Sequence, residues 1–211
     1  GWTTSELWEG IQAANPQGTY DMVSLLIGVN NQYRGYDINE YREEFRFLLG
    51  KAVEFAGGNP EHVIVLSIPD WGVTPFAWGR DTAQIADDID AYNAINLEEA
   101  KKAGVHYVDV TPVSREALND PTLIAGDDLH PSGKMYTEWA KLALPIAIRI
   151  LEYNQSNQFK CTNGEQFMPT IKAVNHVAVV VDDMEKSLKF WRDALGIQLH
   201  ELRDVPAEKS Q

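Results

Sequence analysis

Residues 20–31 read YDMVSLLIGVNN. An apolar run of this length, closed by Gly28 and followed by asparagines, predicts a buried strand over Tyr20–Val29, because a helix of comparable burial would need a longer apolar pattern. The strand places Asn30 and Asn31 at its carboxyl end. The pattern of the flanking residues then decides what kind of sheet this strand belongs to.

Helical and strand patterns alternate along the first 153 residues. Helices are predicted from Ser5 to Ala14 and over Asn39–Phe55, Asp81–Ala103 and Pro131–Tyr153, with a kink at Pro145, and further strands over His62–Ile68 and Val105–Val110. This alternation predicts an α/β fold in three layers, a doubly wound parallel sheet with helices on both faces. In such sheets, functional residues gather at the carboxyl ends of the strands.

The composition limits the classes of partner. Hydrophobic residues make up 44% and charged residues 23% of the 211 residues, and the net charge is −13, with 11 basic and 23 acidic residues in 1–153. An acidic surface repels nucleic acids and anionic membranes, so we expect a small, neutral substrate. No apolar run reaches the roughly 20 residues of a membrane span, and the single Cys161 excludes an internal disulfide.

The chain divides into parts of different character. Residues 1–153 form the predicted domain, residues 154–167 read as a polar linker, and residues 168–211 predict a β-α-β segment that is too small to bury a core alone. The chain starts at Gly1 and shows no leader pattern. We therefore expect an N-terminally incomplete first domain, an incomplete second one and a cytoplasmic location, while the oligomeric state stays open.

Two motifs lie where the fold predicts functional residues. Asp127 precedes His130 by three residues, so its carboxylate is able to hold one imidazole nitrogen while the other takes a proton from a nucleophile. Asn30, beside Gly28, offers an amide donor for a developing oxyanion. Each motif alone is more typical of an ordinary turn. Ser132, two residues after His130, is typical of a helix cap rather than a nucleophile.

Together the two motifs resemble the third and fifth sequence blocks of the SGNH (GDSL-type) hydrolases, with Asn31 in place of the usual aspartate. The resemblance implies a flavodoxin-like fold and cofactor-free hydrolysis of a small carboxylic ester by a Ser-His-Asp mechanism. It makes His130 the general base, Asp127 its orienting partner, and Asn30 and Gly1 donors to the oxyanion. The Gly-Asp-Ser block with the nucleophile is absent, so we expect the chain as given to be inactive.

The aromatic loop Pro69–Trp78 follows the second predicted strand. It is suited to line an acyl pocket or, equally, to cover the edge of the core. If the cleft lacks a nucleophile altogether, the alternative is a non-catalytic pseudo-hydrolase.

The last segment resembles the opening β-α-β of a vicinal-oxygen-chelate (glyoxalase-like) domain of the methylmalonyl-CoA epimerase type, through Val174–Val181, Asp183–Trp191 and Leu195–Ile197. The resemblance makes His176 a ligand of a divalent metal (Co, Mn or Zn), provided that the domain is complete. A metal-dependent isomerase is therefore the second functional reading. Because Met168 stands where such a domain begins, we hypothesise that two adjacent coding regions are read as one chain.

Overall fold

The computed structural model describes the backbone of residues 1–158 and the side chains of residues 1–152. The chain divides into two compact units, Gly1–Pro169 and Thr170–Gln211, and the fold below is that of the first. The predicted β-α-β segment and His176 lie outside the described residues.

Three short parallel strands form the described sheet. They are β1 (Val23–Leu25), β2 (Val63–Leu66) and β3 (His106–Val108), in the order β1-β2-β3. Val23 pairs with Val63, and Ile64 pairs with His106. All neighbours are parallel, because each connection between strands contains a helix that returns the chain to the starting edge. The predicted parallel α/β sheet is confirmed.

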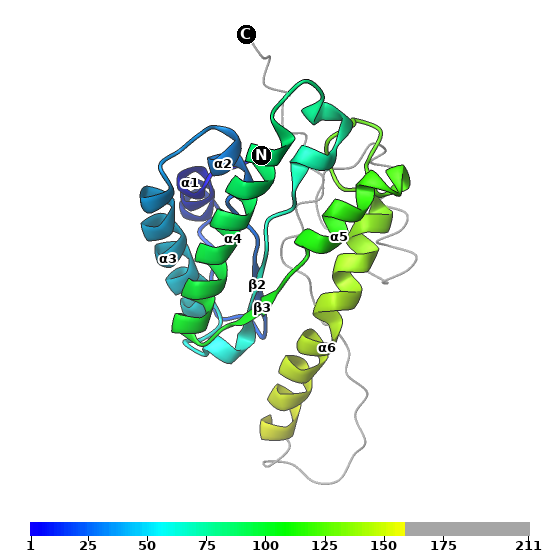
Figure 1. Cartoon of the computed structure of the whole chain (residues 1–211). Helices are drawn as coiled ribbons and strands as arrows, with labels where there is room; N and C mark the ends of the chain where they lie inside the picture. Colours follow the sequence, from blue (N-terminus) through cyan, green and yellow to red (C-terminus); the bar gives the residue numbers. More distant parts are fainter. Residues whose placement is uncertain (159–211) are drawn as a thin grey trace. The chain divides into compact units, whose positions relative to one another are not determined.

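Helices cover both faces of this sheet. Figure 1 shows α3 and α4 on one side of the strands and α5 and α6 on the other, which confirms the three layers. The helices are α1 (Thr4–Ala14), α2 (Val29–Tyr33), α3 (Ile38–Phe55), α4 (Thr82–Ala103), α5 (Thr111–Arg115) and α6 (Gly133–Gln158). Short 3-10 turns lie at Pro60–His62, Trp71–Val73, Pro75–Ala77, Glu116–Leu118 and Pro121–Leu123.

The alternating side chains of β2 separate two hydrophobic clusters. Val63 and Val65 belong to the cluster that includes Phe45 of α3 and Ile89 of α4, whereas Ile64 packs in the cluster that includes Trp139 of α6. Successive residues of a strand point to opposite faces. The central strand is therefore buried on both sides, as a doubly wound sheet requires.

The strands are shorter than the apolar runs that predict them. The run Tyr20–Val29 was expected to be one strand, but only Val23–Leu25 pairs, and α2 already begins at Val29. Gly28 ends the run with φ of +125°, and a Cβ there would lie 2.4 Å from the Tyr41 hydroxyl oxygen. Only glycine permits both this backbone and this contact. Asn30 and Asn31 accordingly lie on a short helix rather than in an extended loop.

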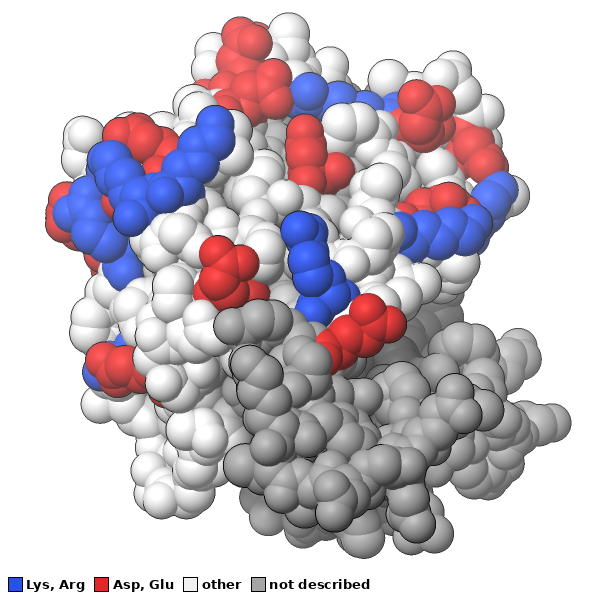
Figure 2. Space-filling view, turned by 90° about the horizontal axis from the view of Figure 1, so that it is seen from below, with Lys and Arg blue, Asp and Glu red and all other residues white. Residues whose placement is uncertain are grey.

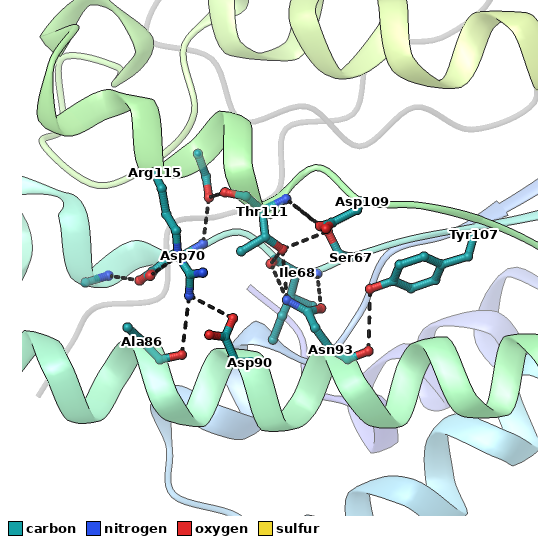
Figure 3. Close-up of polar contacts among 12 residues, drawn as sticks. Ser67, Ile68, Asp70, Ala86, Asp90, Asn93, Tyr107, Asp109, Thr111 and Arg115 are labelled. Atoms are coloured by element: carbon teal, nitrogen blue, oxygen red, sulfur yellow. Dashed lines mark hydrogen bonds and ion pairs between the residues drawn. The ribbon is translucent and has the colours of Figure 1, made fainter.

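Buried side-chain hydrogen bonds fasten the ends of β2 and β3 to α4 and α5 (Figure 3). The Ser67 hydroxyl oxygen accepts from the backbone N–H groups of Val110 (2.7 Å) and Thr111 (3.0 Å). Asn93 of α4 pairs with both backbone groups of Ile68, at 2.8 and 3.1 Å. These contacts fix the positions at which the loops of the carboxyl edge begin.

The described helices lack the features of a membrane span, and charged side chains of both signs lie on one face. None of the described helices combines the length and the apolar character that crossing a bilayer requires. On the face seen in Figure 2, lysine and arginine side chains lie beside acidic ones. The basic side chains of this face are therefore interspersed with acidic ones.

A buried carboxylate joins α3 to α4. The side chain of Glu99 is 2% exposed and contacts Arg42 at 2.7 Å, Arg46 at 2.9 Å and Lys102 at 3.1 Å. The hydrogen bond from Arg46 is the main cause that lowers the pKa of Glu99 to about 2, against the opposing effect of burial. The folded state thus binds the Glu99 proton less tightly than the unfolded chain does.

We expect Glu99→Gln to lower the free energy of unfolding by about 2 kcal/mol at pH 7, because Arg42 and Arg46 lose the carboxylate that both contact. The loss is limited because their guanidinium groups remain hydrated. A folded-state pKa that is depressed stabilises the protein above the unfolded pKa, and this contribution disappears as the pH falls from about 5 toward 2. Urea unfolding at pH 7, 5 and 3 measures the difference. The matched control is Glu43→Gln, whose exposed side chain contacts Arg46 alone; equal effects of the two substitutions would contradict the prediction.

Candidate active site

The Asp127–His130 turn forms the first half of the candidate site. His130 Nδ1 lies 2.5 Å from Asp127 Oδ2, and Asp127 Oδ1 accepts from the backbone N–H groups of Leu129 (3.1 Å) and His130 (2.9 Å). The predicted contact between Asp127 and His130 is thus present. The carboxylate leaves the Nε2 side of the imidazole available for proton transfer.

The same hydrogen bonds set the charge state of Asp127. Partial burial alone would raise its pKa, but the hydrogen bonds from the backbone and imidazole of His130 and from Leu129 outweigh it and lower the pKa below its ordinary value. Asp127 is therefore ionised at neutral pH. The side chains of His130 and Asp127 remain 39% and 38% exposed, so a substrate has access to the pair.

Asn30 and Gly1 form the second half. The Asn30 side-chain amide lies against the first residues of the chain, with Nδ2 donating to the Trp2 carbonyl oxygen at 3.2 Å. A Cβ at position 1 would lie 2.8 Å from Asn30 Nδ2, so a side chain there would displace the amide. The residues that the sequence singles out as the two oxyanion donors are thus neighbours, brought together by tertiary packing.

The side chain of Asn31 fixes the position of Thr4, close to the start of the chain. Its side chain is fully buried, accepts from the Thr4 backbone N–H at 3.1 Å and donates from Nδ2 to Thr4 Oγ1 at 2.6 Å. The Thr4 hydroxyl in turn donates to Glu44 of α3. An asparagine satisfies this arrangement because it both donates and accepts, whereas a carboxylate only accepts.

The aromatic loop connects the two halves. Trp71 Nε1 donates to Gln32 Oε1 of α2 at 2.7 Å, and the Phe76 backbone N–H donates to the Asp128 carbonyl oxygen at 3.0 Å. Between this loop and residues 117–128 lies an open pocket of about 580 Å³, whose lining includes Trp78, Arg80 and Asp128. The volume falls in the range of small-molecule sites.

Two features of this region escape the sequence analysis. Arg80 lies over the rings of Tyr33, Trp71 and Phe76, and Asp70 pairs with Arg115 of α5 at 2.9 Å. The sequence shows the aromatic residues, but no local spacing links Tyr33 or Arg115 to them, because both contacts join distant segments.

The two remaining candidates from the sequence are Ser132 and the metal ligand His176. Ser132 caps α6, with its hydroxyl donating to the Thr122 carbonyl oxygen at 2.7 Å and accepting from the Met135 N–H at 3.4 Å, which confirms the helix-cap interpretation. In the part of the chain that the structure describes, no three His, Cys, Asp or Glu side chains come together as metal ligands would. His176, the candidate metal ligand, lies outside the described residues.

We expect Asn31→Asp, which restores the residue typical of SGNH hydrolases, to destabilise this protein by about 1–3 kcal/mol at pH 7, because two carboxylates then compete for one Thr4 hydroxyl. The deficit should shrink below pH 4 as the introduced buried acid is protonated. Thermal unfolding across pH 3–7 measures it. The double variant Asn31→Asp, Glu44→Gln should recover most of the stability at pH 7; no recovery would sink the explanation.

Comparison with solved structures shows the same fold in two enzymes. An acetylxylan esterase from Geobacillus stearothermophilus matches with a TM-score of 0.51 and 23% identity, over 69% of this chain and 68% of that one. An α/β hydrolase from the metagenome of Lake Arreo, Spain, matches with a TM-score of 0.50 and 20% identity over the same shares. Comparison with curated protein sequences finds no significant match.

Family models match both parts of the chain. Residues 173–211 match the Glyoxalase/Bleomycin resistance protein/Dioxygenase superfamily, in agreement with the resemblance of the last segment. Residues 1–137 match the GDSL-like Lipase/Acylhydrolase family. This match spans more than half of the chain and includes the Asp127–His130 turn, Asn30 and Gly1, so the chain belongs to the GDSL-like lipase/acylhydrolase family.

Proposed function

We propose that this domain hydrolyses carboxylic esters by a Ser-His-Asp mechanism, with His130 as general base, Asp127 as its orienting partner, and Asn30 and the backbone of Gly1 as oxyanion donors. The observation that carries the proposal is the 2.5 Å contact between His130 Nδ1 and an Asp127 carboxylate that is itself held by two backbone N–H groups.

The proposed chemistry follows from this arrangement. His130 Nε2 takes the proton of a serine hydroxyl while the serine oxygen bonds to the ester carbonyl carbon, and the developing oxyanion accepts from Asn30 and Gly1. The bond to the alcohol oxygen then breaks, and His130 returns the proton to that oxygen. Water attacks the acyl-enzyme by the same sequence and releases the acid. No cofactor enters any of these steps.

The nucleophile is the residue that this proposal places outside the chain. No serine of the 211 residues follows Gly-Asp, and Ser132 is engaged in capping α6. Within the described residues, β1 pairs with β2 on one side only. The other edge of β1 is thus available to a further strand, which would carry the serine to the carboxyl edge of the sheet.

The structures of the Geobacillus stearothermophilus esterase add support. Variants of that enzyme that lack a serine, an aspartate or a histidine are described as catalytic mutants. Its aspartate and histidine are three positions apart, as Asp127 and His130 are. The likeness in sequence is low, so the acetylated sugar that this enzyme's name gives is not carried over.

We propose for the whole chain that residues 1–153 form an incomplete hydrolase domain, that residues 154–167 are a linker whose first five residues continue α6, and that residues 168–211 are the first part of a glyoxalase-like module. The match over residues 173–211 favours this second module. A metal-dependent isomerase activity would need ligands besides His176, and a pseudo-hydrolase would keep the cleft without turnover.

The decisive experiment measures p-nitrophenyl acetate turnover by the 211-residue chain and by a version extended at its N-terminus by a Gly-Asp-Ser strand. We expect background rates from the first and turnover from the second. In the extended protein, His130→Ala should abolish turnover, Asp127→Asn should lower kcat by about 10⁴, and Asn30→Ala should lower it by about 10²–10³.

Ser132→Ala serves as the matched control, because it removes a nearby hydroxyl and should leave turnover largely intact. Turnover that withstands His130→Ala would refute the proposed mechanism. Turnover by the 211-residue chain that requires Ser132 would instead identify a different nucleophile.

For the second module, we expect calorimetry with Co²⁺ to detect no micromolar site, because a single imidazole supplies one of the about three protein ligands that a catalytic metal generally needs. Binding that His176→Ala abolishes would show that other residues of the chain, or of a second copy, complete the ligand set.

A further inference from the structure

Arg80 is held by aromatic rings rather than by a carboxylate. Its guanidinium carbon lies 5.3 Å from the ring centroids of Tyr33 and Trp71 and 5.4 Å from that of Phe76. Each other arginine of residues 1–120 has an acidic partner, at Glu6, Glu43, Glu98, Glu99, Asp70 or Asp90. No such ion pair involves Arg80 among the described residues, although the domain is strongly acidic.

Contact with aromatic rings positions a guanidinium without consuming its donors. The rings attract its charge, while its N–H groups remain able to donate in their own plane. Of the five N–H donors of an arginine, the described contacts of Arg80 engage one, through Nη2 to the Tyr33 hydroxyl at 3.4 Å. Arg80 is therefore oriented and still free to bind an anion.

Arg80 also lies at the junction of the two halves of the candidate site. Tyr33 is on α2, the short helix that carries Asn30. Phe76 is hydrogen-bonded to Asp128, which lies between Asp127 and His130. Arg80 and Asp128 both line the open pocket of about 580 Å³. His130 and Asn30 are not among the residues that line this pocket, so it is the contacts of Tyr33 and Phe76 that place Arg80 between the helix of Asn30 and the turn of His130.

We propose that the substrate is an ester that carries a carboxylate, and that Arg80 binds this carboxylate while the ester group lies between His130 and Asn30. The inference rests on the proposed function, and it replaces the neutral substrate that the overall charge suggests. Arginine and carboxylate form paired, charge-assisted hydrogen bonds. Asp128 opposes this binding, but its carboxylate is not within salt-bridge distance of Arg80, so a ligand is able to meet the cation alone.

The test measures binding to the 211-residue chain, so it needs no nucleophile. The probes are 4-acetamidobenzoate and acetanilide, two amides that differ by one carboxylate and stand in for the corresponding aryl acetates. We expect NMR titration to give about tenfold tighter binding of the carboxylate compound. Arg80→Gln should remove this preference, and Asp128→Asn should increase it, since asparagine tolerates the positive φ of position 128.

Arg149→Gln is the matched control, because it removes the same charge from α6 and should leave the preference unchanged. Arg80→Lys keeps the charge but not the planar fork, and should retain a reduced preference. If Arg80 merely fastens the loop, Arg80→Gln will weaken both probes equally, and the proposal fails. Equal affinities in the parent chain, or no binding of either probe, would likewise overturn it.

The outcome is independent of the catalytic proposal. His130→Ala should keep the ratio of the two affinities, whatever its effect on the affinity of each probe, because the imidazole acts on the reacting bond and not on the carboxylate. A charge preference that depends on Arg80 in a protein whose extended form has no esterase activity would refute the proposed function and leave the anion site standing. Esterase activity of the extended protein without a preference for the carboxylate compound would refute the anion site and leave the proposed function standing.

Discussion

Three strands of three or four residues cannot by themselves position the loops that leave them, so the carboxyl edge depends on buried side-chain hydrogen bonds. Ser67 joins the end of β2 to the start of α5 through Val110 and Thr111. Asn93 of α4 likewise hydrogen-bonds to both backbone groups of Ile68. An unmet polar group costs more in this low-dielectric interior than at the surface. Side-chain hydrogen bonds thus satisfy backbone groups that the short strands leave unpaired, and together these bonds form a rigid frame.

This network of hydrogen bonds determines the positions of the loops that form the candidate site. Asp70 is fixed by its pair with Arg115, and Arg115 also reaches Asp90 of α4, at 2.8 Å (Figure 3). The aromatic loop therefore starts from a point that is tied to both layers of helices. Its far part meets the turn of His130 through the bond from Phe76 to Asp128. Rigid placement of this kind is what a site needs if binding energy is to orient a reacting bond.

The sequence predicts what is local and misses what is distant. The helix Asp81–Ala103 was placed to within a residue, because Asp81 caps it and Gly104 ends it in the left-handed conformation. The Asp127–His130 contact is likewise contained in one turn. The extent of the strand Tyr20–Val29 was wrong, because only Val23–Leu25 pairs and because the conformation of Gly28, packed against the Tyr41 hydroxyl, turns the chain into α2. The cluster around Arg80 joins residues 33, 71, 76 and 80, and no pattern of the intervening sequence specifies it.

The two halves of the candidate site differ in the same way: one is held by local contacts and the other by contacts between distant segments. The His130 half is closed within four residues, so changes elsewhere in the core leave its geometry intact as long as the turn persists. The Asn30 half depends on a chain of contacts that runs from Asn31 through Thr4 to Glu44 on α3, while Asn30 itself binds the Trp2 carbonyl oxygen. A change on α3 therefore acts on the proposed oxyanion donors without touching the proposed base. In the proposed mechanism, such a distant change would weaken stabilisation of the transition state and leave in place the pH dependence that the mechanism assigns to His130.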